Sequence, residues 1–138
     1  MALSEEINIP QKPPMVMIDR LARISGSETE TLLTIRKDNV FVDDGLFTEA
    51  GLIENMAQTA AAGVEQNAGS GNKPAPGFIG SIRNLNIYIL PPVGVQIKTI
   101  VKVEHEVGDA TVVKGEIFLN NNLSASCEMN IFRIINHE

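Results

Sequence analysis

The spacing of apolar residues predicts one long helix, over residues 48–67. Its apolar residues recur at intervals of three and four, which is the spacing that one face of a helix requires. Thr48 can act as the N-cap, and Glu49 then lies at the positive end of the helix dipole. Residues 59–63 (TAAAG) carry almost no side-chain bulk, so we expect strands to approach closely and curl around this helix. The apolar face comprises Leu52, Ile53, Met56, Ala57, Ala60, Ala61 and Val64.

Two strands are predicted before this helix. Residues 15–24 (MVMIDRLARI) form an apolar run, and residues 28–37 (ETETLLTIRK) are rich in threonine and aliphatic residues. The turn signal Gly26-Ser27 separates them. Residues 38–47 carry Asp, Asn and Gly, and we expect them to connect the second strand to the helix.

A β pattern continues from residue 77 to the end of the sequence, after a loop over residues 69–76. A hairpin is expected at Asn120, Asn121 and Asn122, between the last two strands. In residues 84–90, the apolar side would comprise Leu85, Ile87 and Ile89. In residues 123–135, it would comprise Ala125, Cys127, Met129 and Ile131. The predicted strands are residues 84–90, 95–104, 110–119 and 123–135.

This order of elements predicts an α+β fold, in which a curved antiparallel sheet wraps one long central helix. One helix cannot cover both faces of such a sheet, so the other face should be solvated or used in self-association. A length of 138 residues is sufficient for a real hydrophobic core, and we expect residues 1–138 to form a single domain.

Composition and charge exclude several classes of protein. The formal net charge of −6 argues against nucleic acid as the main partner. No apolar run is long enough for a membrane span, and the first residues lack the basic and apolar regions of a signal peptide. The single cysteine, Cys127, rules out an intramolecular disulfide framework and fits a reducing compartment. We therefore expect a cytoplasmic protein.

Three acidic residues are the candidates for chemistry. Glu54 directly follows Leu52 and Ile53 and shares a helix face with Gln58, so its carboxylate lies at the wet edge of the helix or is functional. Asp43 and Asp44 precede the helix; they are either simple loop acids or a base acting on substrate or water. Two adjacent aspartates without neighbouring His or Cys are too few ligands, so we expect no metal site.

The two other reactive residue types are expected to be structural. His105 continues the odd-numbered apolar register of Val101 and Val103, which favours a partly buried structural histidine. Cys127 alternates with core residues and has no basic partner nearby in the sequence, which is typical of a small buried hydrophobic residue rather than a nucleophile.

Three passages resemble segments of the hot-dog fold 3-hydroxyacyl-(acyl-carrier-protein) dehydratases. Residues 51–58 (GLIENMAQ) are similar to the family's helix motif G-x-L-x-x-E-A-M-A-Q, the most specific of the three. Residues 9–20 (IPQKPPMVMIDR) look like the family's opening, with Gln11 where the family often has His. Residues 77–80 (GFIG) are similar to the F-x-G turn that enters the third strand. The P-P-M opening and the aspartate-rich loop also resemble a subgroup of dehydratase-like proteins from aryl-polyene-type clusters.

The resemblance implies a thioester substrate carried on phosphopantetheine, either by an acyl carrier protein or as coenzyme A, with no cofactor of the protein's own. It also implies a homodimer, which could assemble further, with two substrate tunnels at the interface. Glu54 matches the family's catalytic carboxylate. The family's catalytic His would fall within residues 39–44 (NVFVDD), which contain none. The candidate substrate-binding residues are Gln58, Phe78, Gly80 and Arg83. Gln58 could instead orient Glu54 or bind backbone at the dimer interface, and Gly80 is either a strand-entry glycine needed for close packing or part of the thioester-binding wall. Arg83, with Lys98 and Lys102, could also dock an acidic carrier.

Three functions follow from these residues. The leading one is a dehydratase-like protein acting on 3-hydroxyacyl thioesters, in fatty-acid or polyene-type biosynthesis, with Glu54 as the acid/base group and Asp43 or Asp44 as possible partners. The second is an acyl thioesterase, in which Glu54 or a loop aspartate attacks the thioester or activates water. The third is a non-catalytic binding or scaffolding subunit that pairs with an active partner.

Overall fold

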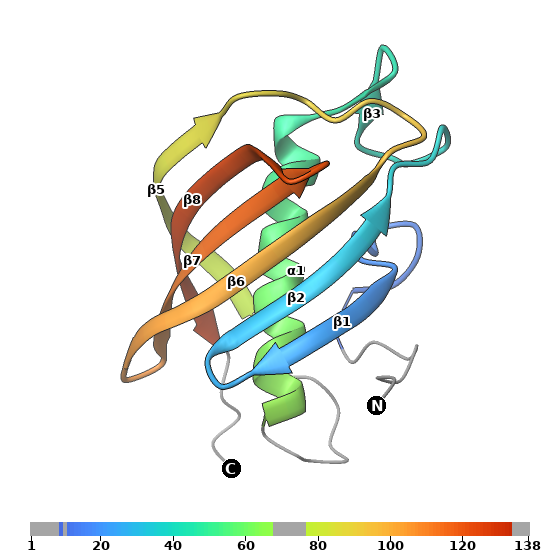
Figure 1. The fold of residues 1–138 in the computed structure, drawn as a ribbon. Helices are drawn as coiled ribbons and strands as arrows, with labels where there is room; N and C mark the ends of the chain where they lie inside the picture. Colours follow the sequence, from blue (N-terminus) through green and yellow to red (C-terminus); the bar gives the residue numbers. More distant parts are fainter. Residues whose placement is uncertain (1–8, 10, 68–76, 134–138) are drawn as a thin grey trace.

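The computed structural model describes residues 9, 11–67 and 77–133. One helix, α1 (Glu49–Asn67), packs against a six-stranded antiparallel sheet whose strand order is β1-β2-β6-β7-β8-β5. A small two-stranded sheet, β3-β4, lies near the start of the helix (Figure 1). The strands are β1 (Arg20–Ser25), β2 (Glu28–Thr34), β3 (Val42–Asp43), β4 (Leu46–Phe47), β5 (Gly77–Ile87), β6 (Gln96–Val107), β7 (Ala110–Leu119) and β8 (Asn122–Arg133).

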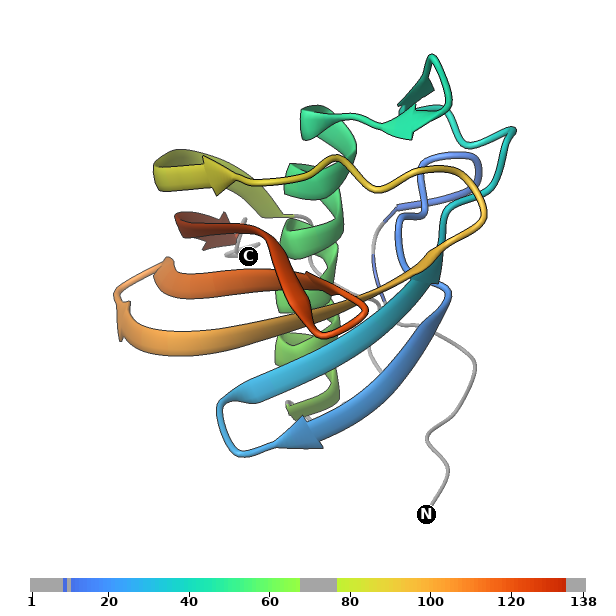
Figure 2. The same ribbon diagram turned by 45° about the horizontal axis from the view of Figure 1, so that its top comes forward.

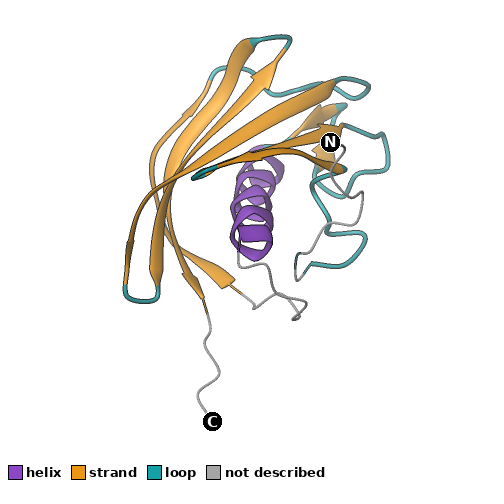
Figure 3. Ribbon diagram, turned by 60° about the horizontal axis from the view of Figure 1, so that its bottom comes forward, coloured by secondary structure: helices purple, strands orange, loops and turns teal. Residues whose placement is uncertain are grey.

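The sheet curves around the helix, as the sequence predicts. Figures 2 and 3 show α1 lying along the concave side of the sheet, with β1 and β5 at its two edges. The predicted order of two strands, one helix and then long antiparallel strands is confirmed for the main sheet, while the predicted connection over residues 38–47 also contains the short strands β3 and β4. The helix begins one residue after Thr48, whose hydroxyl donates to the backbone carbonyl of Phe41 at 2.7 Å.

Small residues allow the close contact between helix and sheet. A side chain at Gly63 of α1 would collide with the Thr29 hydroxyl on β2. A Cβ at Gly115 of β7 would lie 2.7 Å from the sulfur of Met56 on the helix. The predicted close approach of helix and sheet is thereby confirmed. One of the two glycines, Gly115, belongs to the sheet, and the sequence of the helix alone could not indicate it.

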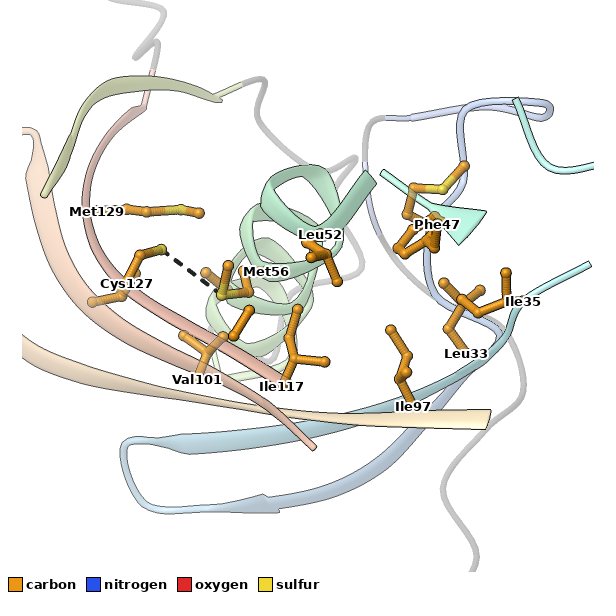
Figure 4. Close-up of a cluster of buried hydrophobic side chains, with 14 residues drawn as sticks. Leu33, Ile35, Phe47, Leu52, Met56, Ile97, Val101, Ile117, Cys127 and Met129 are labelled. Carbon is orange, nitrogen blue, oxygen red and sulfur yellow. Dashed lines mark hydrogen bonds between the residues drawn. The ribbon is translucent and has the colours of Figure 1, made fainter. Parts of the chain in front are cut away.

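The main core lies between α1 and the concave face of the sheet (Figure 4). Leu52 and Met56 of the helix pack there against Val101, Ile117 and other fully buried side chains from the central strands. The buried residues of β8 include Ala125, Cys127 and Met129, with Ile131 partly buried, which is the predicted apolar side of the last strand.

The chain before β1 is not a strand, contrary to the prediction for residues 15–24. β1 begins only at Arg20, five residues later than predicted. The backbone groups of Met15 and Met17 bind helix side chains instead of a neighbouring strand. Met17 and Ile18 are nevertheless buried, so this part of the apolar run belongs to the core without forming a strand.

The prediction for residues 84–90 is wrong in its bounds, and its apolar face is confirmed only at Ile87, which packs against the core. β5 runs from Gly77 to Ile87, and its pairing with β8 shifts register between Arg83 and Asn86. Asn84, with a φ of 54°, lies in this irregularity. Leu85 lies within the irregularity, where a bulge redirects side chains, and is 36% exposed, while Ile89 lies after the strand has ended and is 46% exposed.

A second register shift explains the position of His105. The pairing of β6 with β7 is interrupted between Val103 and His105, and His105 is exposed rather than partly buried. The odd-numbered register is therefore correct up to Val103 and fails beyond it, because one extra residue exchanges the two faces of a strand.

The convex face of the sheet carries a row of charged residues of both signs. Glu28 of β2 pairs with Lys102 of β6, which pairs with Lys114 of β7. Lys114 in turn pairs with Glu128 of β8, and Glu128 with Arg83 of β5. A row of mixed charge that crosses five strands favours contact with water over an apolar interface on this face.

Candidate functional site

Gln58 is the best-anchored polar side chain of the helix. It is completely buried, and its Oε1 accepts a hydrogen bond of 2.7 Å from the backbone N–H of Met17. Its Nε2 donates to the backbone carbonyl of Met15 at 2.8 Å and to Oε2 of Glu54 at 3.0 Å. One amide therefore links the segment before β1 to the candidate catalytic carboxylate.

Glu54 lies on the flank of α1 that the sheet does not cover. It is partly buried, and its neighbours on this flank are small or apolar: Ala50, Ile53, Ala57 and Ala61. Gln58 holds one carboxylate oxygen, while Oε1 has no hydrogen-bond partner within the described ranges. The arrangement presents one fixed acid, with one open oxygen, on an otherwise apolar strip.

Asn55 is a polar residue of the helix that the sequence analysis missed. It is fully buried, donates from Nδ2 to the backbone carbonyl of Met17 at 2.8 Å, and accepts on Oδ1 from the hydroxyl of Thr99. Its position between Leu52 and Thr59 on the buried face was the available signal, because a buried amide must find partners. It ties the segment before β1 to the helix and does not contact Glu54 through any described hydrogen bond.

Asp43 and Asp44 lie in the hairpin formed by β3 and β4. Asp43 pairs with Leu46, and Asp44 and Gly45 have φ values of 53° and 76°, as a two-residue turn with both central residues left-handed requires. Both aspartates are exposed, and no described hydrogen bond joins either one to Glu54. The turn alone explains why Asp and Gly occupy positions 44 and 45. The roles of Asp43 and Asp44 as bases stay predictions.

The other implied binding residues lie on β5. The side chain of Phe78 is outside the described residues, although its backbone pairs with Phe132. A side chain at Gly80 would collide with the ring of Phe132, so this glycine is needed for packing whatever else it does. Arg83 is exposed opposite Glu128. The substrate-binding roles of these residues stay predictions.

A pocket of about 200 Å³ opens on the other side of the segment before β1. Its wall includes Pro14, Met17, Asp19, Arg36 and Asn39, and it does not include Glu54. Asp19 is engaged there, since its Oδ2 accepts from the backbone N–H of Thr34 at 2.8 Å. The candidate acid and this pocket are therefore separate features of the chain.

Cys127 is placed as predicted. It is buried, with its thiol 3.8 Å from the sulfur of Met56, and burial together with the charge of Glu128 raises the thiol pKa from 9.0 to about 11. Such a thiol is a poor nucleophile near neutral pH. Among the described residues, no group of three or more His, Cys, Asp or Glu is placed to hold a metal ion.

Comparison with known proteins decides the family. A protein-family model described as ApeP-like, ApeP dehydratase, matches residues 4–137. The chain belongs to the ApeP-like dehydratase family. The predicted resemblance to the hot-dog dehydratases is thereby confirmed. A search of curated proteins found no match.

Solved structures share the hot-dog fold with this ApeP-like chain. A chain of the dehydratase heterocomplex ApeI:P from Xenorhabdus doucetiae superposes with a TM-score of 0.87 at 17% identity, over 99% of this chain and 94% of the other. An uncharacterised protein from Pyrococcus horikoshii gives 0.71 at 12% identity, over 99% and 97%. A hypothetical thioesterase from Streptococcus pneumoniae gives 0.68 at 9% identity, over 85% and 91%. At these identities the likeness establishes the fold.

No helix in the described ranges of this family member is both long enough and apolar enough to cross a membrane. Residues 39–44 contain no His. This chain therefore differs at these positions from the His-containing hot-dog dehydratases that it resembles.

Proposed function

We propose that this chain binds acyl thioesters and takes part in the dehydration of 3-hydroxyacyl thioesters. The observation that carries the proposal is the fixed carboxylate of Glu54 on an apolar helix flank, in a chain that belongs to a dehydratase family. The phosphopantetheine would belong to the substrate, whether an acyl carrier protein or coenzyme A supplies it.

Dehydration removes a proton from the α-carbon and hydroxide from the β-carbon, giving an enoyl thioester and water. Glu54, in its acid form, would donate a proton to the departing hydroxyl, so that water and not hydroxide leaves. The α-proton needs a separate base. Asp43 and Asp44 are the candidates on this chain, but their hairpin is not linked to Glu54 by any described hydrogen bond.

A second protein chain would complete the site. β5 is an edge strand, so one side of its backbone has no partner strand in the described sheet. Exposed apolar side chains gather on β5 and just after it: Ile82, Leu85, Tyr88 and Ile89, of which Tyr88 is 64% exposed. An apolar sheet edge favours association with another strand.

The partner is either a second copy, as expected for a homodimer, or a different chain; a similar protein is part of the dehydratase heterocomplex ApeI:P. A different chain could also supply the base that residues 39–44 lack. In that case this chain contributes the acid and its partner the base, and neither chain is active alone.

Docking of an acidic carrier would involve the basic residues of the convex face and of β5. Arg83 and Lys102 are exposed, while Lys98 lies over the ring of Phe118, 5.7 Å from its centroid. Glu28 and Glu128 lie in the same row as Lys102 and Arg83, which limits the positive charge available there. Arg83 is the more accessible candidate because it lies on the edge strand.

The test is an incubation of the purified chain, alone and with a co-purifying hot-dog partner, with a 3-hydroxyacyl thioester and its enoyl counterpart. Interconversion of the two, followed by mass spectrometry of the thioester, is the expected result. Release of free thiol would identify a thioesterase instead. Binding of the thioester without either reaction would identify a non-catalytic subunit.

A further inference from the structure

We infer that Gln58 is a positioning residue, which fixes the carboxylate of Glu54 for the reaction, and does not itself contact substrate. This inference rests on the function proposed above. Of the roles that the sequence leaves open for Gln58, it selects the orientation of Glu54 over substrate binding, because the side chain is completely buried.

Backbone groups determine the orientation of the Gln58 amide. The N–H of Met17 can only donate, so the atom 2.7 Å from it must be the amide oxygen. The carbonyl of Met15 can only accept, so the atom 2.8 Å from it must be the amide nitrogen. The two contacts agree on one orientation, and the usual ambiguity between the two ends of a glutamine side chain is removed.

The remaining hydrogen of the same nitrogen then points to Glu54. Nε2 of Gln58 lies 3.0 Å from Oε2 of Glu54, one helical turn away. A donor that is itself held at both ends restricts the rotation of the carboxylate, and Oε1 of Glu54 stays open to a ligand. Groups held in a reactive geometry lower the barrier, and small displacements of them are costly to the rate.

Asn55 provides a matched control for this role. Like Gln58, it is fully buried, and its Nδ2 binds the same segment through the carbonyl of Met17 at 2.8 Å. No described hydrogen bond joins it to Glu54. Loss of either amide loosens the segment before β1, but only the loss of Gln58 frees the carboxylate.

The first experiment compares Gln58→Met with Asn55→Leu in the assembly that turns over the 3-hydroxyacyl thioester. Gln58→Met should lower kcat by at least about 10-fold with KM changed by less than about 3-fold, since the group acts through geometry. Asn55→Leu should lower the melting temperature as much but leave kcat within about 3-fold of the wild type. A Gln58→Met enzyme with wild-type kcat, or equal losses of kcat in both variants, would overturn the inference.

A second measurement does not depend on turnover or on folding of the Gln58 variant. In the ¹⁵N-labelled chain, the side-chain amide signals of Gln58 should shift in Glu54→Ala and stay in place in Glu49→Ala, a change to the exposed acid of the same helix. Unchanged Gln58 signals in Glu54→Ala would show that the contact does not exist. If the wild-type assembly has no dehydratase activity, the proposed function fails, and this measurement still decides the contact.

Discussion

Within slightly more than one turn of α1, hydrogen bonds hold three polar side chains in place. Glu54 is held by one oxygen, Asn55 is fully buried between helix and sheet, and Gln58 links the helix to the segment before β1. The sequence could predict that Glu54 and Gln58 share a face, because that follows from helical spacing. It could not predict the backbone partners of Gln58, Met17 and Met15, which lie 41 and 43 positions earlier and meet the helix only in the fold.

At Cys127 the structure predicts a pH-dependent stability. Because burial raises the thiol pKa to about 11, the unfolded chain loses its thiol proton at lower pH than the folded chain. The stabilisation from this thiol is complete below pH 9.0 and is lost as the pH rises toward about 11. Urea unfolding across this range should therefore show a steeper loss of stability in the wild type than in Cys127→Ala. Equal slopes in the two proteins would contradict the burial of the thiol.

The contact between Gly63 and Thr29 gives a second prediction at this scale. Replacing a helix glycine with alanine usually stabilises by about 1 kcal/mol. Here the new methyl group would collide with the Thr29 side chain. Gly63→Ala should instead destabilise by about 1–3 kcal/mol, the usual cost of overpacking.

Chemical denaturation measures this cost, and Thr29→Ala provides the control. The double variant should recover part of the lost stability, because the colliding hydroxyl has been removed. A more stable Gly63→Ala protein would show that helix and sheet are further apart than described.

At the scale of elements, strand identity was predictable and register was not. β7 occupies the predicted residues 110–119, and the helix differs from its prediction by one residue. The errors in β5 and at His105 come from irregularities in strand pairing. An extra residue in one strand leaves the local apolar pattern unchanged but exchanges the faces beyond it, so the sequence pattern alone cannot reveal it.

The turn between β7 and β8 can be tested directly. Asn120 and Asn121 have φ values of 51° and 66°, which asparagine and glycine tolerate and β-branched residues do not. Asn121→Val should destabilise the protein by about 1–2 kcal/mol, while Asn121→Gly should be neutral or stabilising. Thermal unfolding of the two variants measures the difference. Equal stability of both would contradict a left-handed turn at this position.

At the scale of the whole molecule, the sequence predicted the fold because a single long helix and a series of long strands permit few arrangements. The helix motif then led to the family, which the family model confirms. The surroundings of Glu54 could not be predicted in the same way. The sheet does not cover its flank of α1, and the proposed second chain would cover this flank and the apolar edge at β5.

Association through β5 predicts a particular response to substitution. The chain should form a dimer of identical subunits, and Leu85→Arg should shift it toward single chains because Leu85 is 36% exposed on the edge strand. Val107→Arg is the control, since Val107 is 67% exposed but lies at the end of β6, an inner strand of the sheet. Native mass spectrometry measures both. A wild type that is monomeric by itself would contradict the homodimer and favour a different partner chain.

The central claim is that the carboxylate of Glu54 acts in the reaction, and one comparison tests it most directly. Rates of interconversion between 3-hydroxyacyl and enoyl thioester are measured for Glu54→Gln and for Glu49→Gln, which removes the exposed acid five residues earlier in the same helix. The account predicts that Glu54→Gln lowers kcat by about 10²–10⁴-fold, the usual contribution of a general acid or base, while Glu49→Gln keeps the wild-type rate. Wild-type turnover by Glu54→Gln would contradict it.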